Sequence, residues 1–109
     1  MAVYVDEMCP CLPNKNWRYN ESCHMYAPPD NESDQQLHAI AAKIGLERSW
    51  FQKHERLPHY DRTRSKRKLA LLAGALPADR RMVVDMMNEW REAKLRTFAP
   101  HNRQSESQP

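Results

Sequence analysis

The segment Leu57–Asp61 contains two groups that can hold a metal ion or move a proton, His59 and Asp61, and a run of cations follows it directly. Side chains alternate between the two faces of an extended chain, so His59 and Asp61 should point the same way and Tyr60 the other way. The next segment, 62–68, carries five arginine and lysine residues. This combination predicts a site for an anion. The alternative is an exposed histidine in a loop, with Asp61 as the cap of the next helix.

Two further histidines and one further aspartate could complete such a site: His24, His38 and Asp6. With His59 and Asp61 they supply enough imidazole and carboxylate ligands for Zn²⁺, Mn²⁺ or Fe²⁺, and they leave a position for a water that the metal makes nucleophilic. We assign catalytic roles to Asp6, His38, His59 and Asp61, and metal ligation to His24, His38, His59 and Asp61. The same residues could instead act without a metal, with His59 as general base oriented by Asp61 or Asp6.

The cations beside this site would bind the phosphate group of a ligand or nucleic acid: Arg62, Arg64, Lys66 and Arg67. The sequence therefore predicts a metal-dependent phosphoester or nucleotide hydrolase. The ligand spacing matches no strong zinc signature such as H-E-x-x-H, and with two glycines in the chain the common nucleotide-cofactor fingerprints are absent.

A non-enzymatic binding protein is the alternative from a different class. The basic segment, with Tyr60, Trp50 and Trp17 available for stacking, would suit a surface that binds nucleic acid or a host protein and thereby inhibits or regulates it. A solvated charge run is the commoner explanation of such a segment.

The cysteines open a third possibility, a structural zinc site formed by Cys9, Cys11, Cys23 and His24. Four nitrogen and sulfur ligands are the correct number, but adjacent residues 23 and 24 would point to opposite faces of a strand. An odd number of cysteines in a reducing compartment argues against a disulfide framework.

Length and composition fit one small domain. The chain has 109 residues, of which 40% are hydrophobic and 28% charged, and its formal net charge of +3 is too small to indicate nucleic-acid binding by itself. No apolar run reaches the roughly 20 residues of a membrane helix, and the N-terminus lacks the pattern of a signal peptide. We expect a cytoplasmic protein without a membrane partner, and the oligomeric state stays open.

The elements that must position the candidate residues form a small α/β domain at 1–98 with a short mixed sheet and about three helices, followed by a disordered, flexible tail at 99–109. Runs of β-branched and aromatic residues predict strands near 2–5, 22–27 and 49–52. Apolar residues at helical spacing predict helices near 34–44, 64–73 and 80–95. Aromatic and methionine side chains at these spacings should fill the core, namely Met25, Trp50, Phe51, Met82, Met86 and Trp90.

The ends of the first two helices carry their own signals. Ser33 or Asp34 should cap the start of the first helix, and Gly45 should end it, with Leu46 packed back against the core. Gly74 should end the second helix. That helix begins among cations, although a helix N-terminus favours negative charge, so a bound phosphate would relieve the conflict. His54 should be exposed, and His101 receives no chemical role.

Seven short motifs follow one another along the chain: Val5–Asp6, Cys23–Met25, Leu37–Ala39, Ile44–Gly45, Trp50–Gln52, His59–Asp61 and Ala73–Ala75. In this order they resemble a small phage and bacterial family catalogued as a domain of unknown function (DUF4031), over about residues 2–85. The resemblance implies that the five candidate histidines and aspartates occupy the polar motif positions of that family. It also implies an accessory protein of a bacteriophage, located in the host cell. The family carries no established activity, and its members can differ at Cys23, which argues against cysteine-based chemistry.

Overall fold

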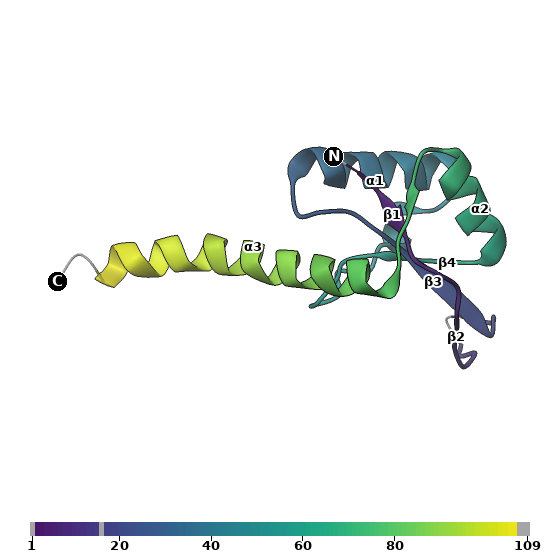
Figure 1. Ribbon diagram of the computed structural model, residues 1–109, viewed down its shortest axis with the longest axis horizontal. Coiled ribbons are helices and arrows are strands. Elements are labelled where there is room, and N and C mark those ends of the chain that lie inside the picture. Colours follow the sequence, from purple (N-terminus) through teal and green to yellow (C-terminus); the bar gives the residue numbers. More distant parts are fainter. Residues whose placement is uncertain (1, 16, 107–109) are drawn as a thin grey trace.

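The computed structural model describes residues 2–15 and 17–106. In chain order its elements are β1 (Tyr4–Val5), β2 (Cys9–Pro10), β3 (Glu21–Tyr26), α1 (Asn31–Lys43), the 3₁₀ helix η1 (Arg48–Trp50), β4 (Tyr60–Arg62), α2 (Arg64–Leu72), β5 (Leu76–Pro77) and α3 (Arg80–Glu106). The described residues thus form the expected small α/β domain, with three α-helices and a five-stranded mixed sheet (Figure 1).

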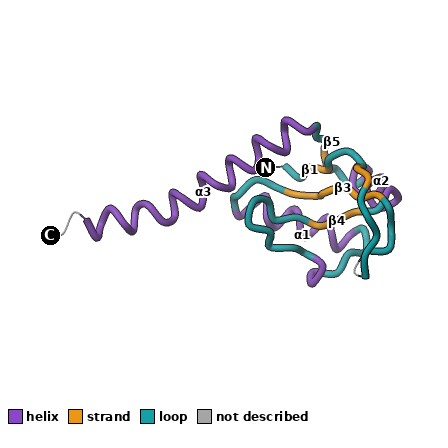
Figure 2. The backbone as a smooth tube through the Cα atoms, turned by 90° about the horizontal axis from the view of Figure 1, so that it is seen from below, coloured by secondary structure: helices purple, strands orange, loops and turns teal. Residues whose placement is uncertain are grey.

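Strand β3 is the centre of the sheet. It pairs in antiparallel fashion with β1, β2 and β4, while β1 pairs in parallel with β5. Met25 of β3 lies opposite Val5 of β1 on one edge and opposite Tyr60 of β4 on the other, so β1 and β4 flank β3 (Figure 2). The same register sets His24 directly opposite Asp61. Residues directly opposite each other share a face of the sheet, so these two side chains are neighbours.

Alternation along the strands divides the core between the two faces of the sheet. Val5, Met25 and Tyr60 are buried in one cluster with residues of α1 and α2, among them Leu37 and Ala70. In Figure 1, α1 and α2 accordingly lie on one side of the strands and α3 on the other.

The second face is covered only in part. Tyr26 is buried there against Met86 of α3, with Trp90 packed beside them. His24 lies two residues before Tyr26 on β3 and therefore shares this face. The contacts of α3 are with the Tyr26 end, so the surface around His24 is left accessible.

Both predicted glycine stops are confirmed. Gly45 and Gly74 have φ angles of 89° and 109°, in the left-handed region that favours glycine. After α1, Gly45 N–H donates to the carbonyl of Ala42 at 3.1 Å and Leu46 N–H to that of Ala41 at 2.8 Å. Leu46 is buried in the core, as predicted. This pair of hydrogen bonds satisfies carbonyls that the end of a helix would otherwise leave without partners.

The predicted cap at the start of the first helix was one turn too late. Asp30, not Ser33 or Asp34, caps α1, because its carboxylate accepts from the backbone N–H of Ser33 at 2.7 Å and from the Ser33 hydroxyl at 3.0 Å. Ser33 is fully buried within the first turn. The chain turns at Pro29, where the backbone N–H of Asp30 donates to the carbonyl of Pro28 at 2.8 Å, and the helix begins directly after this turn.

Several other sequence expectations differ from the structure. The segment 49–52 is no strand: η1 turns the chain at Arg48–Trp50, and only Gln52 makes a β-bridge, with His59. Trp50 is 50% and Met82 38% exposed, so neither belongs to the core. The last helix runs to Glu106, beyond the expected end at 95. The tail expected at 99–109 therefore overlaps this helix, and residues 107–109 lie outside the described residues.

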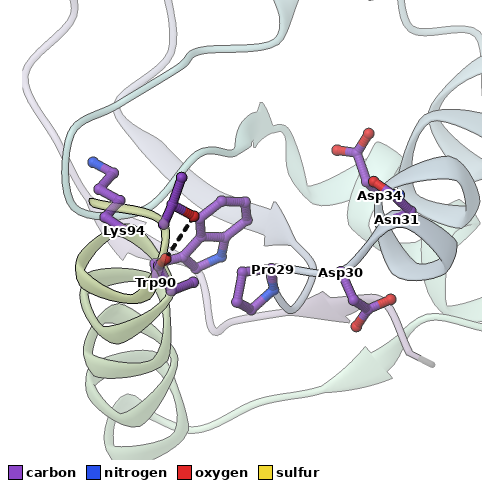
Figure 3. A pocket seen from close by; sticks show the side chains of 8 residues that line it. Pro29, Asp30, Asn31, Asp34, Trp90 and Lys94 are labelled. Carbon is purple, nitrogen blue, oxygen red and sulfur yellow. Dashed lines mark hydrogen bonds between the residues drawn. The ribbon is translucent and has the colours of Figure 1, made fainter. Parts of the chain in front are cut away.

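Trp90 attaches α3 to the rest of the domain, because its indole N–H donates to the carbonyl of Ala27 at 2.9 Å. A cavity of about 940 Å³ lies beside it, with Trp90 and Lys94 of α3 on one side and Asp30 and Asp34 on the other (Figure 3). Neither histidine nor cysteine lines this cavity, and Asp30 is already the cap of α1. It therefore does not account for the chemistry predicted from the sequence. Within the described residues, none of the helices combines the length and apolar character needed to cross a membrane.

Candidate functional site

Four side chains meet on the accessible part of the second face: Asp6, His24, His59 and Asp61. Asp6 follows β1 directly, and His24 and Asp61 face each other across β3 and β4. Nδ1 of His24 lies 2.7 Å from Oδ2 of Asp6, and Nε2 of His59 lies 3.3 Å from Oδ1 of Asp61. Nε2 of His24 is 3.9 Å from the same Asp61 oxygen, and the centroids of the two imidazoles are 4.6 Å apart. We call these four residues the His/Asp cluster.

The hydrogen bonds of the two imidazoles decide which ring nitrogen carries a proton. A carbonyl or carboxylate oxygen only accepts, so Nδ1 of His59 donates to the Leu57 carbonyl at 2.6 Å, and Nδ1 of His24 donates to Asp6. In the neutral rings both Nε2 atoms then carry a lone pair, and both lie beside Oδ1 of Asp61. Three acceptor atoms so close together repel one another, unless a metal ion or a proton lies between them.

Charge in the cluster is distributed unevenly. The hydrogen bond to Asp6 is the main cause of the raised pKa of His24, which burial opposes and the charges of Asp6 and Asp61 support. Burial alone would raise the pKa of Asp61, but the hydrogen bond and charge of His59, with smaller contributions from Gln52 and His24, bring it below the usual value. Asp61 is therefore a carboxylate at neutral pH, and a metal ion would have to displace a proton that His24 holds more firmly than a free histidine does.

His24, His59 and Asp61 could share one metal ion. Among the residues that the structure describes, these three form the group whose ligand atoms lie within 4.8 Å of one another. The side chain of His24 is 39% exposed and that of Asp61 28%, so solvent reaches the site from one side. Each histidine donates its other N–H to an oxygen acceptor, as metal-bound histidines usually do. Three protein ligands leave at least one position for water or substrate.

Three further groups fix the cluster, and the sequence pointed to none of these roles. The side-chain amide of Gln52 donates to the second oxygen of Asp61, and the Gln52 backbone pairs with that of His59. The carbonyl of Leu57 orients His59. The Arg67 guanidinium donates to the backbone carbonyl of Asp6 at 2.7 Å. The only sequence signal for Gln52 was its place in the motif Trp50–Gln52, and a carbonyl contact has no sequence signal.

Asp6 orients His24 but is not one of the three grouped ligands. Asp6→Asn should therefore lower the affinity for Zn²⁺ by about 10–100-fold, the usual effect of losing an outer-shell partner of a metal-bound histidine. Competition with a chromogenic chelator would measure this. Glu7→Gln, the adjacent exposed carboxylate, is the matched control and should change nothing. An Asp6→Asn protein with the affinity of the unchanged protein would contradict a role for Asp6 in the site.

His38, expected to be both a ligand and a catalytic residue, does not join the cluster. Its Nδ1 lies 2.8 Å from the hydroxyl of Tyr60 and its Nε2 3.3 Å from Asp34, and its ring packs edge to face on Phe51. Burial, with the charge of Arg48, lowers the pKa of His38. The cause is topological: α1 covers the face of the sheet that Tyr60 enters, whereas His59 and Asp61 point to the other face. His54 is exposed, as predicted.

The cysteines do not come together with His24. Cys23 is fully buried, its side chain lies on the opposite face of β3 from His24, and burial raises the pKa of its thiol to about 12. Cys9 is exposed on β2, and the thiol of Cys11 contacts the carbonyl of Tyr19. Within residues 2–15 and 17–106 no cysteine belongs to a group that could hold a metal ion. The geometry thus gives a structural zinc site no support.

Most of the basic segment has structural contacts. Arg64 forms two hydrogen bonds of 3.0 and 2.8 Å with the carboxylate of Glu21. The Lys66 ammonium donates to the carbonyl of Ile44 at the end of α1, 2.7 Å away, and Arg67 contacts Asp6. These contacts explain the cations at the start of α2 without a bound phosphate. Their binding of phosphate or nucleic acid stays a prediction.

The chain belongs to the family described as "Protein of unknown function (DUF4031)", whose model matches residues 3–90. The match includes all four residues of the His/Asp cluster, and the description assigns the family no activity. No curated protein and no solved structure shows significant similarity to the chain. The family resemblance seen in the sequence is thereby confirmed, while the bacteriophage setting stays a prediction.

Proposed function

We propose that the protein is a metal-dependent hydrolase in which His24, His59 and Asp61 hold a divalent ion. The observation that carries this proposal is the convergence of two Nε2 atoms on one carboxylate oxygen, with each Nδ1 atom in contact with an oxygen acceptor. Two imidazoles and one carboxylate suit Zn²⁺, Mn²⁺ and Fe²⁺. The partial exposure of His24 and Asp61 gives water and substrate access to such an ion.

The chemistry follows from the remaining groups. A divalent ion held by these three residues would lower the pKa of a bound water to about 7 and so supply a nucleophile near neutral pH. Asp61 supplies negative charge that fixes the ion, and the Asp6–His24 hydrogen bond keeps the His24 ring in the ligating tautomer. A phosphoester is the substrate class we favour, because cations line a hollow that begins at Asp61.

Tag-free protein stripped with a chelator and reloaded with Zn²⁺, Mn²⁺ or Fe²⁺ tests this function. We expect one metal equivalent per chain, together with metal-dependent hydrolysis of bis(4-nitrophenyl) phosphate or 4-nitrophenyl phosphate. Stripped protein, with or without added Mg²⁺, is the control. Stoichiometric metal without turnover of any phosphoester would contradict hydrolysis but leave the metal site. Absence of bound metal would contradict the whole proposal and favour a proton between His59 and Asp61.

A further inference from the structure

A hollow of about 870 Å³ shares Asp61 with the His/Asp cluster and is otherwise lined by a different set of groups. Asp61 and Gln52 form the end nearest the cluster, and Arg62 and Lys66 lie on the side of α2. Asp61 and Arg62 are neighbours on β4 and project from opposite faces of it. Because both line the hollow, it wraps around the outer edge of this strand.

Arg62 is the unusual residue of this hollow. It is only 3% exposed, its Nε has no hydrogen-bond partner, and no ion pair engages it among the described residues. Its guanidinium lies over the ring of Tyr60, 5.3 Å from the centroid, and burial lowers its pKa to about 10. A buried guanidinium without an anion is costly, because its lost hydration is not replaced. An anionic ligand in the hollow would replace this lost hydration.

The other residues that line the hollow indicate what else this ligand should contain. The Lys66 ammonium uses one donor on the Ile44 carbonyl, an uncharged partner, so its positive charge is not neutralised there. Trp50, half-exposed at the end of η1, and Trp17 present aromatic surface to the same hollow. The indole N–H of Trp17 is held by the carbonyl of Glu21 at 3.2 Å, so this ring is fixed in place. Cations beside fixed aromatic faces suit a phosphate joined to a planar ring.

We infer that this hollow binds a nucleoside monophosphate group, with the phosphate paired to Arg62 and Lys66 and the base stacked on Trp50 or Trp17. The inference names the substrate class of the proposed hydrolase, and to that extent rests on it. Binding itself needs no metal, because none of these four residues belongs to the His/Asp cluster. The two proposals can therefore fail separately.

Calorimetric titration of chelator-treated protein with AMP and with UMP tests the inference. We expect binding of at least one of them, weakened about tenfold or more in Arg62→Met, since charge-assisted hydrogen bonds to a phosphate are lost. The melting temperature of Arg62→Met should stay equal or rise, because an unpaired buried charge is removed. A purely structural arginine would instead lower it. Arg91→Met, an exposed arginine of α3 that does not line the hollow, is the matched control and should bind the nucleotide normally.

The variant Trp50→Ala tests the contact with the base separately from the contact with the phosphate. Because Trp50 is half-exposed, we expect its replacement to leave folding unaffected. It should weaken AMP or UMP binding several-fold and leave inorganic phosphate binding unchanged. His59→Ala should retain nucleotide binding even if it loses metal. The inference is overturned if neither nucleotide binds, if Arg62→Met binds as tightly as the unchanged protein, or if inorganic phosphate binds as well as both nucleotides.

Discussion

Replacing His59 or His24 by alanine should abolish stoichiometric metal binding, and replacing His38 should not. His24 and His59 each contribute one of the three ligand atoms that lie within 4.8 Å of one another. Loss of an outer-shell partner costs about 10–100-fold in metal affinity, so loss of a ligand should exceed about 100-fold. Elemental analysis after gel filtration measures the metal content, and hydrolysis of bis(4-nitrophenyl) phosphate should fall with it.

His38→Ala is the matched control because it removes the same ring from the other face of the sheet. His38 is also buried in part and hydrogen-bonded, to Tyr60, so its loss disturbs the fold about as much as the loss of His59. Melting temperatures recorded with and without Zn²⁺ complete the comparison. Metal should raise the melting temperature of the unchanged protein and of His38→Ala, since binding to the native state alone stabilises it. An equal metal-induced rise in His59→Ala would contradict the assignment of ligands.

The sequence was sufficient to pair His59 with Asp61 but not to choose their partner. Alternation in an extended segment places these two side chains on one face, and the structure has them 3.3 Å apart. His24 joins them because Cys23–Met25 pairs with Tyr60–Arg62 in one particular register. That register results from long-range packing, and a shift by one residue would turn His24 to the other face. No local pattern in the sequence contains this information.

The contacts of His38 and of the basic segment likewise depend on long-range structure that no local sequence pattern contains. His38 lies on α1, and which face of the sheet that helix covers is a property of topology. The cations were correctly recognised as unusual for a helix start, yet Arg64, Lys66 and Arg67 find partners from residues far along the chain. Arg62, which the strand carries into the interior, is the buried member of this run, and its Nε has no hydrogen-bond partner.

The stability of the metal-free protein and the additional stability given by bound metal should change with pH in opposite directions. In the metal-free protein the pKa of His24 is raised above its ordinary value of 6.5, chiefly by the hydrogen bond to Asp6. A raised pKa contributes stability that is fully present below the unfolded value and is lost as pH rises through the folded one. The metal-free protein should therefore lose stability on going from about pH 6 to about pH 9.

Stabilisation by bound metal should change with pH in the opposite direction, because the metal binds the deprotonated Nε2 of His24. Each proton displaced makes the apparent affinity rise about tenfold per pH unit until the ring is deprotonated in the free protein. The difference in melting temperature with and without Zn²⁺ should thus widen as pH rises, even while the metal-free value falls. Asp61 does not contribute to these changes with pH, because its lowered pKa places its titration in the acid range.

Scanning calorimetry from about pH 6 to about pH 9, with Zn²⁺ or with a chelator, measures both curves. Asp6→Asn weakens the hydrogen bond that chiefly raises the pKa of His24 and removes the carboxylate charge that supports it, so the metal-free curve should flatten while a smaller metal-induced rise remains. Glu7→Gln should reproduce both curves of the unchanged protein. If the two curves of the unchanged protein run parallel, metal does not compete with the proton of His24. Binding at the His/Asp cluster would then be excluded, whatever the metal content of the protein.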